Sequence, residues 1–438
     1  MTEIVSPRSA TTTGGRQASL RLIAARKALA VGQPDLVPPP SWRWLALSDL
    51  ARLESGHTPS RRHAEYWRGT IPWLSIQDAK ANHGGVVDDT TEHITDLGLA
   101  NSSARVLPAA TVCLSRTASV GYVVITSRSM ATSQDFVNWV CGEHLTPAFL
   151  KYIFLAEGDD LLRFASGAVH QTIYFPEAKA FHVCVPNRIE QQRIVAILDK
   201  AFLAITHAKA DAERNLLNAR ELAEQLTASV FNPVSAPWPE RPLEQVADIV
   251  NGYAFKSTDF HAVTGVKSIK ITNVGVRQFV ADHSNYLPAP FAQSYSGVAA
   301  SAGSIVLALT RTIIANGLKV AVVPDEYDGA LVNQRVAAIT PRGQDLLTPF
   351  LFAYLTTSRV SGYVRERVNT LMQPNLSIAD LRALPIPVPP IAQQRNLAEK
   401  LARTNDEFDA LLGLYRRKLT ALDELKKSLL HQAFSGGL

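Results

Sequence analysis

Two long stretches of the chain carry apolar residues at alternating spacings of three and four positions. One runs from Ile189 to Phe231 without proline or glycine, and the other runs from Ile391 to Phe434. This spacing is typical of a helix with a single apolar seam, as in a coiled coil. A helix over 189–231 would be roughly 65 Å long, which exceeds the diameter of one small domain. Each helix could lie on its own domain, but antiparallel packing of the two is favoured because each seam can bury the other.

The second half of the chain repeats the first in the same order. "LSDLARLESG" at 47–56 corresponds to "LEQVADIVNG" at 243–252, with an offset of 196. The same ladder of matches pairs Arg116 with Arg311, Gln134 with Gln334, and the short helix expected at 147–165 with that expected at 349–367. Near the helix starts, "QQR" occurs at 191–193 and again at 393–395. An ordered set of this length indicates a tandem duplication, with a unit far longer than a solenoid repeat.

Short β-like runs, such as "TVCLSRT" and "SIVLALT", predict that each repeat begins with a compact, β-rich domain. The expected fold class is α+β, with two tandem mixed α/β domains joined and separated by two long helices that form an antiparallel coiled coil with pseudo-two-fold symmetry. The expected parts are a leader at 1–40 with a short basic helix at 18–31, a first domain at 41–187, a central spacer helix at 188–233, a second domain at 234–389 and a C-terminal spacer helix at 390–438.

Composition and charge restrict the function classes. The chain has 438 residues, lacks any apolar run of membrane-spanning length, and has no apolar segment at its start that is typical of a secretory signal. Cys113, Cys141 and Cys184 share no metal-ligand spacing, so we interpret them as buried free thiols of a cytoplasmic protein. The net charge of +5 permits, but does not require, a polyanionic partner such as DNA.

Motifs of catalysis are missing from the sequence. It contains no phosphate-binding G-x-x-x-x-G-K-[ST], no dinucleotide-binding G-x-G-x-x-G and no Asn/Asp-Pro-Pro-Tyr segment, and its eleven histidines lack metal spacing. Polar residues at duplicated positions offer a different chemistry, because Arg can read guanine and Gln can read adenine in the major groove. The alternative is that Arg116 and Arg311 support the fold by bonding loop carbonyls. The candidate DNA-contacting residues are Arg61, Arg62, Trp73, Gln77, Lys80, Arg116, Gln134, Lys256, Lys270, Asn273, Arg311, Gln334 and Arg335.

These segments together resemble the specificity (S) subunit of type I restriction–modification systems. The resemblance rests on "YWRGTIPWLSIQDAK" (66–80), "LSRTASVGYVVI" (114–125), "ATSQDF" (131–136), the "EQQRI" helix entry and the closing "LLHQAFSGGL" (429–438). It implies two target-recognition domains, each reading one half of a split double-stranded DNA target, with the helices as a spacer. It also implies that this chain holds no cofactor, and that two methyltransferase subunits with S-adenosylmethionine and two restriction subunits with ATP and Mg join it. The assembled complex would be an adenine-N6 DNA methyltransferase and an ATP-dependent endonuclease.

Two departures from the family pattern and two alternatives remain. The second copy has Lys267–Ser268 where the first has the tryptophan of "IPW", and the leader is outside the shared pattern. The chain could instead serve a methylation-only or related two-component system, or be a coiled-coil scaffold without DNA. The repeated motif either bonds groups of the first helical turn, which we favour, or docks a methyltransferase. Its residues are Gln191, Gln192, Arg193, Gln393, Gln394 and Arg395.

Overall fold

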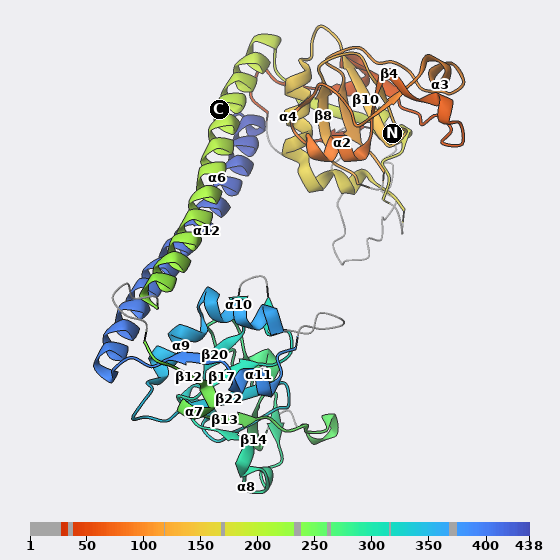
Figure 1. The fold of residues 1–438 in the computed structure, drawn as a ribbon. Helices are drawn as coiled ribbons and strands as arrows, with labels where there is room; N and C mark the ends of the chain where they lie inside the picture. The colour runs from red at the N-terminus through yellow and green to blue at the C-terminus, as the bar shows by residue number, and fades with distance from the viewer. Residues whose placement is uncertain are drawn as a thin grey trace. The chain divides into compact units, whose positions relative to one another are not determined.

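The computed structural model of the protein describes residues 28–33, 38–117, 119–167, 171–231, 238–260, 264–314, 317–367 and 375–438. It divides into two compact units (Figure 1): unit 1 is residues 1–211 with 419–438, and unit 2 is residues 212–418. Two long helices, α6 (Arg188–Val230) and α12 (Ile391–Ser435), each contribute to both units. The two helices expected from the apolar spacing are thereby confirmed. Among the described residues, no helix has the length and apolar character needed to cross a membrane.

Unit 1 is built on a five-stranded sheet in the order β3-β10-β7-β8-β5, of which β3, β10, β7 and β8 are antiparallel neighbours. Two three-stranded sheets, β1-β11-β2 and β6-β4-β9, lie beside it. The strands are β1 (Leu29–Val31), β2 (Arg43–Ala46), β3 (Ala51–Ser55), β4 (Trp67–Leu74), β5 (Val86–Val87), β6 (Glu92–Ile94), β7 (Val112–Ser115), β8 (Val123–Thr126), β9 (Ala131–Thr132), β10 (Phe136–Cys141) and β11 (Phe181–Val185). The short helices are α1 (Leu47–Leu50), α2 (Ile76–Ala81), α3 (Asp96–Ala100), α4 (Pro147–Glu157) and α5 (Phe175–Lys179).

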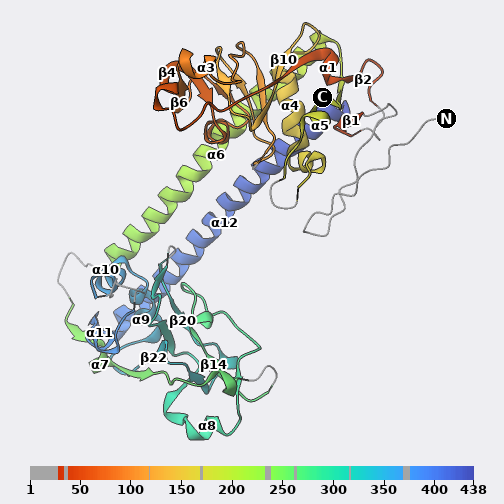
Figure 2. The ribbon, with the colours of Figure 1, turned by 90° about the vertical axis from the view of Figure 1, so that its right-hand side faces the viewer.

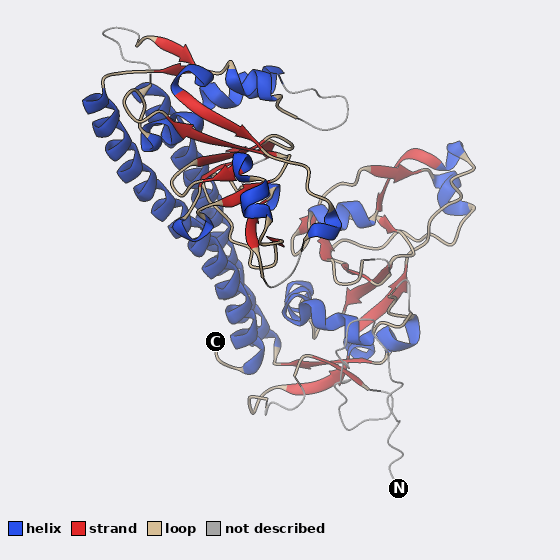
Figure 3. Ribbon diagram, turned by 90° about the horizontal axis from the view of Figure 1, so that it is seen from below, coloured by secondary structure: helices blue, strands red, loops and turns tan. Residues whose placement is uncertain are grey.

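Unit 2 repeats this plan with a four-stranded antiparallel sheet, β13-β22-β17-β20, and a second sheet, β15-β14-β21-β16. Two-stranded sheets β12-β23 and β18-β19 complete it. The strands are β12 (Glu240–Pro242), β13 (Ala247–Asn251), β14 (Val266–Ile269), β15 (Tyr286–Leu287), β16 (Ala299–Ala300), β17 (Ile305–Ala308), β18 (Ile313–Ile314), β19 (Gly317–Leu318), β20 (Val320–Val322), β21 (Ala330–Val332), β22 (Val336–Pro341) and β23 (Pro385–Pro387). The short helices are α7 (Leu243–Val246), α8 (Phe291–Ser294), α9 (Thr348–Leu355), α10 (Ser358–Arg367) and α11 (Ile378–Arg382). Figure 3, coloured by secondary structure, shows that the other helices and the strands are short compared with the two long helices.

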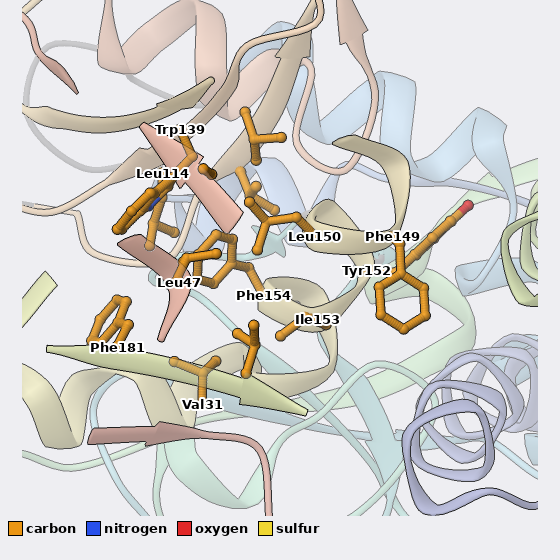
Figure 4. Close-up of a cluster of buried hydrophobic side chains, with 14 of the residues drawn as sticks. Val31, Leu47, Leu114, Trp139, Phe149, Leu150, Tyr152, Ile153, Phe154 and Phe181 are labelled. Carbon is orange, nitrogen blue, oxygen red and sulfur yellow. The ribbon is translucent and has the colours of Figure 1, made fainter. Parts of the chain in front are cut away.

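The core of unit 1 lies between the main sheet and α4. Every residue of β7 and β8 is buried, and α4 packs against both strands. Figure 4 shows Leu150 and Phe154 of α4 on the side of Leu114, whereas Phe149 points away from that strand. Ile194 and Leu198 of α6 join the same core, together with Leu430 and Ala433 of α12. The two long helices are therefore held in unit 1 by the same apolar cluster that stabilises its sheet.

Within unit 1, α6 and α12 run antiparallel to each other (Figure 2). Arg193 Nη2 donates to the Leu438 carbonyl at 2.7 Å, and Lys209 Nζ donates to Asp423 Oδ1 at 2.7 Å. From the first contact to the second, the residue number rises along α6, from 193 to 209, and falls on the α12 side, from 438 to 423. The two helices therefore run in opposite directions. In unit 2, Ala398 and Leu401 of α12 share a core with Phe231, the residue after α6. The predicted antiparallel packing is confirmed, and the arrangement with each helix alone on its domain is wrong.

Three local predictions are wrong. The helix expected at 18–31 does not include its last residues, because Leu29–Val31 is β1 and pairs with Phe181–Val183 of β11; residues 18–27 lie outside the described part of the chain. The helix expected at 147–165 leaves α geometry at Gly158, whose φ is 52°, and continues as a 3-10 helix to Phe164. Its partner is likewise divided into α9 and α10.

Candidate nucleic-acid interface

In each unit, the chain leaving the edge strand of the main sheet is hydrogen-bonded to the segment that leads into the neighbouring strand, β10 in unit 1 and β22 in unit 2. In unit 1, the His57 amide donates to the Thr132 carbonyl at 2.9 Å. In unit 2, the Tyr253 amide donates to the Val332 carbonyl at 2.9 Å, and the Gln334 amide donates to the Tyr253 carbonyl at 2.9 Å. We name residues 133–135 and 333–335 the reading turns. Exposed residues are Gln134 in the first turn and Gln334 and Arg335 in the second, whereas Ser133 is buried.

Glycines permit this close approach. A Cβ added at Gly56 would overlap the Ser133 carbonyl oxygen, and a Cβ added at Gly252 would overlap the Asn333 carbonyl oxygen. Only hydrogen fits in that space, which is why both repeats have glycine after the edge strand. The close contact fixes the position of each reading turn relative to its sheet.

Gln134 and Gln334 occupy the same place in the two reading turns. Each is exposed and lies two residues before the next strand, which is β10 starting at Phe136 in unit 1 and β22 starting at Val336 in unit 2. The Thr58 hydroxyl donates to Gln134 Oε1. The equivalence predicted for these glutamines is confirmed, and their amides are accessible to a partner.

Arg116 and Arg311, in contrast, are not equivalent. The Arg116 amide donates to the Asp135 carbonyl at 2.7 Å, and its carbonyl accepts from the Ile173 amide at 2.8 Å. Leu309 makes these two contacts in unit 2, with Arg335 and Leu376. The register of the duplication therefore pairs Arg116 with Leu309, and the offset of 195 between the two arginines is wrong by two residues.

The two arginines also differ in environment. Arg116 is half-buried, its Nε donates to the Gln134 carbonyl at 3.1 Å, and burial lowers its pKa. This agrees with the supporting role, in which arginine bonds loop carbonyls. Arg311 is exposed with a left-handed φ of 48°, and within the described residues no hydrogen bond or ion pair engages its side chain. Arg311 is thus the better candidate to contact a base.

Two candidates are buried, so their predicted contacts with DNA are wrong. Trp73 is 4% exposed, and its indole nitrogen donates to the His57 carbonyl at 3.0 Å. Asn273 is fully buried, and its Oδ1 accepts from the Lys270 amide at 2.8 Å, as Asp78 does from Ser75 in unit 1. Both side chains stabilise loops. Ser268 stands in the place of Trp73 in unit 2 and is also buried.

The remaining basic candidates differ in how far their charge is neutralised. Arg61 forms a bidentate pair with Glu92, with Nη2 2.7 Å from Oε2, and stacks 3.7 Å above the Trp67 ring. This pair lowers the pKa of Glu92 and raises that of Arg61. Lys270 is half-buried, donates to Asn285 Oδ1 at 2.6 Å and has a pKa lowered by burial. The other exposed candidates are Arg62, Gln77, Lys80, Lys256, Gln334 and Arg335.

In each copy of Gln-Gln-Arg, one buried glutamine joins the start of the long helix to the preceding loop by hydrogen bonds; we call this glutamine the joint. Gln191 is fully buried: its Oε1 accepts from the Thr146 amide at 2.9 Å, and its Nε2 donates to the carbonyls of His144 at 2.9 Å and Pro186 at 3.0 Å. Gln394 is fully buried and bonds Leu347, Asp345 and Pro389 in the same way. The structurally equivalent glutamines, Gln191 and Gln394, are 203 residues apart, whereas the two copies of the letters "QQR" are 202 residues apart.

At these two glutamines, both predicted roles of the motif, bonding within the first helical turn and docking of a methyltransferase, are wrong. Gln191 and Gln394 cannot dock a partner because they are buried, and they bond the preceding loop and proline carbonyl, not the amides of the first helical turn. The accessible members of the motif are Gln192, Arg193, Gln393 and Arg395. Of these, Arg193 is paired with Glu190 at 2.7 Å.

One feature was not predicted from the sequence: a cluster of four aromatic rings beside the reading turn of unit 2. Tyr253, Phe255, Phe291 and Tyr295 have centroids 4.8 to 6.1 Å apart. The segment "NGYAF" (251–255) carries a signal, since two aromatic residues follow the Asn-Gly pair at the end of β13. No local pattern links it to Tyr295.

The cysteines and possible metal ligands form no site in the part of the chain that the structure describes. All three cysteines are free, as predicted; Cys113 is buried and the other two are half-buried. Burial raises the pKa of Cys113, raises that of Cys141 to about 12 and raises that of Cys184 to about 11. Across the part of the chain that the structure describes, no three His, Cys, Asp or Glu side chains come together to hold a metal ion.

Comparison with known proteins identifies the class of this chain. The type I restriction modification DNA specificity domain matches residues 39–213 and, a second time, residues 236–413. These two segments make up most of the chain, so the protein belongs to this family.

Individual relatives agree with the family assignment. The chain is 28% identical over 212 residues to the type I restriction enzyme MjaVIII specificity subunit of Methanocaldococcus jannaschii, covering 48% of each chain. It is 30% identical over 164 residues to the EcoR124I/EcoR124II specificity subunit of Escherichia coli, covering 36% of this chain and 40% of that one. The matches thus span about half, or less, of these curated relatives.

Solved structures share the fold. A chain from a study of complex assembly and conformational transition of the type I R-M system superimposes with a TM-score of 0.73 at 18% identity, covering 92% of this chain and 100% of that one. The HsdS subunit of Thermoanaerobacter tengcongensis gives a TM-score of 0.60 at 18% identity, covering 92% and 99%. The predicted α+β architecture of tandem domains with long helices is confirmed.

Proposed function

We propose that this chain is the DNA-recognition subunit of a type I restriction–modification complex, and that each unit reads one half of a bipartite double-stranded target. The observation that carries the proposal is the pair of reading turns. Each presents an exposed glutamine on a turn that a glycine contact holds against a buried sheet. Preorganised polar groups of this kind suit base readout, because a partner does not have to order them on binding.

The two reading turns offer different chemistry, as two different half-sites require. Unit 2 presents Gln334 and Arg335 in its turn, with Arg311 exposed two residues beyond Leu309, which bonds that turn. A glutamine amide can pair with adenine N6 and N7, and a guanidinium can pair with guanine O6 and N7. In unit 1 the arginine is used to support Gln134, which leaves that glutamine as the exposed reader. Lys80, Lys256 and Arg62 are exposed cations suited to phosphates.

The helix pair and its accessible residues supply the rest of the proposed role. We assign α6 and α12 to spacing of the two half-sites, and Gln192, Arg193, Gln393 and Arg395 to docking of partner subunits. Two methyltransferase subunits with S-adenosylmethionine and two restriction subunits with ATP and Mg would carry out adenine-N6 methylation and DNA cleavage in the cytoplasm. This chain would contribute recognition and no catalytic step.

Selection of DNA by the purified complex tests the proposal. The chain is co-purified with the products of its neighbouring genes, and a random duplex library is enriched for bound sequences. We expect two short defined segments at a fixed separation, with binding that weakens as salt rises. Enrichment of no sequence would contradict the proposal and favour a scaffold without DNA.

One variant makes this test specific to unit 2. Arg311→Ala should weaken binding of the selected target by about 5- to 150-fold and relax one position in one half. Arg382→Ala, at an exposed arginine on α11 of the same unit, is the matched control and should leave binding unchanged. Equal effects of the two variants would show that Arg311 contributes only general charge.

A further inference from the structure

Tyr253 is an exposed aromatic residue fixed beside the reading turn of unit 2. Its side chain is 46% exposed. Its amide donates to the carbonyl of Val332, the residue just before that turn, and its carbonyl accepts from the Gln334 amide in the turn, both at 2.9 Å; Gly252 allows the close approach. The backbone of Tyr253 is therefore fixed against the turn that carries Gln334.

The ring of Tyr253 is held in place by other aromatic rings. Its centroid is 4.8 Å from that of Tyr295 and 5.1 Å from that of Phe255. Phe255 is 9% exposed and shares a small core with Leu287 and Leu331 of the second sheet. A hydrogen bond with Tyr253 also raises the pKa of Tyr295. An exposed ring supported in this way loses little side-chain entropy when it contacts a partner.

Unit 1 has a different residue at this place. His57 follows Gly56 as Tyr253 follows Gly252, and both amides bond the strand before the reading turn. His57 is half-buried, its carbonyl accepts from Trp73, and among the described residues it makes no ring contact. The two repeats therefore share the framework and differ in the side chain that it presents. A difference of this kind is what two half-sites of different sequence require.

We propose that Tyr253 contacts a base of the half-site read by unit 2, with its ring against the 5-methyl group of a thymine in the major groove. The inference rests on the proposed function and deepens it. The thymine methyl is the apolar feature of base edges in that groove, so an apolar ring beside a polar reader distinguishes thymine from cytosine and from uracil. Tyr295 acts as a positioning residue that orients the ring.

Removal of the methyl group alone tests this contact. In the selected target duplex, each thymine is replaced in turn by deoxyuridine, and binding by the complex is measured. One replacement in the unit 2 half-site should weaken binding about four-fold, as expected for one buried methyl group. Tyr253→Ala and Tyr253→His, which gives unit 2 the residue of unit 1, should bind the thymine and deoxyuridine duplexes equally. Tyr253→Phe keeps the ring and should keep the difference.

Val280→Ala is the matched control, since Val280 is also 46% exposed and lies in unit 2 outside the aromatic cluster; it should keep the difference. A deoxyuridine scan that leaves the binding of the unaltered complex unchanged overturns the proposal without requiring any variant to fold. Equal discrimination by the unaltered complex and Tyr253→His also overturns it. A selected target with two halves would still support the proposed function in both cases, whereas the absence of such a target would refute the proposed function itself.

Discussion

Replacement of Gln191 by alanine should destabilise unit 1 far more than replacement of its neighbour. The buried side chain satisfies three backbone groups: the Thr146 amide at 2.9 Å and the carbonyls of His144 and Pro186 at 2.9 and 3.0 Å. Each lost bond costs about 1 kcal/mol net, because a buried donor or acceptor remains unpaired. We therefore expect Gln191→Ala to lower the free energy of unfolding of unit 1 by about 3 kcal/mol.

Urea unfolding followed by tryptophan fluorescence measures this change. The signal reports mainly on unit 1, because Trp42, Trp44, Trp67, Trp73 and Trp139 belong to it and Trp238 alone belongs to unit 2. A loss of about 3 kcal/mol corresponds to a midpoint lower by roughly 1 to 2 M urea. Gln192→Ala removes an exposed amide and should change stability by less than about 0.5 kcal/mol. Equal midpoints for the two variants would refute the assignment of Gln191 as the joint.

Three further predictions address the charge pair, the glycine contact and the spacer. Arg61 lowers the pKa of Glu92 in the folded state, so the pair stabilises unit 1 at pH values above the unfolded-state pKa of about 4.3. This contribution is lost as the pH falls through the lowered pKa. The urea midpoint of Glu92→Gln should therefore approach that of the parent below about pH 4. Persistence of the pH 7 difference at pH 3 would contradict this. Gly252→Ala forces a Cβ onto the Asn333 carbonyl and should weaken target binding at least ten-fold, whereas Gly343→Ala, with open space around the added Cβ, should leave it within two-fold; equal binding would show that the contact does not position the reading turn. Insertion of seven residues into both α6 and α12 adds roughly 10 Å of helix and should lengthen the preferred spacer by about three base pairs, as read by selection of bound DNA; an unchanged spacer would contradict the spacing role.

The long helices could be predicted because their signal is local and repeated. The apolar spacing predicted 189–231, and α6 spans Arg188–Val230. The main-sheet strands could also be located, since continuous apolar runs such as those of β7 and β17 are buried throughout. The end of the leader could not, because "LAV" at 29–31 has the composition of a helix as well as of a strand, and its pairing with β11 is set by residues 152 positions away.

The register of the duplication could not be read from matching letters. Arg116 and Arg311 look equivalent in sequence, but hydrogen bonds to the reading turns pair Arg116 with Leu309. The two-residue shift is already present along the strands, because the pairing with β10 and β22 aligns Val112 of β7 with Ile305 of β17. Burial of polar side chains was equally invisible: Asn273 and Gln191 have the donors and acceptors expected of a contact residue, and the fold uses them internally.

The aromatic support of Tyr253 shows the same limit. Phe255 is two residues away in the sequence, but Phe291 and Tyr295 arrive from a different segment after β15. Contacts of this separation depend on the sheet that brings the segments together. The residue type and its exposure were therefore needed together before Tyr253 could be recognised as a candidate base contact.

The central claim is that one chain reads two separate half-sites, and mapping of methylated adenines tests it most directly. The chain is expressed with its methyltransferase partner in cells that lack other adenine methylation, and modified positions are located across the genome. The account predicts one motif made of two defined segments at a fixed separation, and Gln334→Ala should relax one segment while the other is kept. A single continuous motif, or relaxation of both segments by this one change, would contradict it.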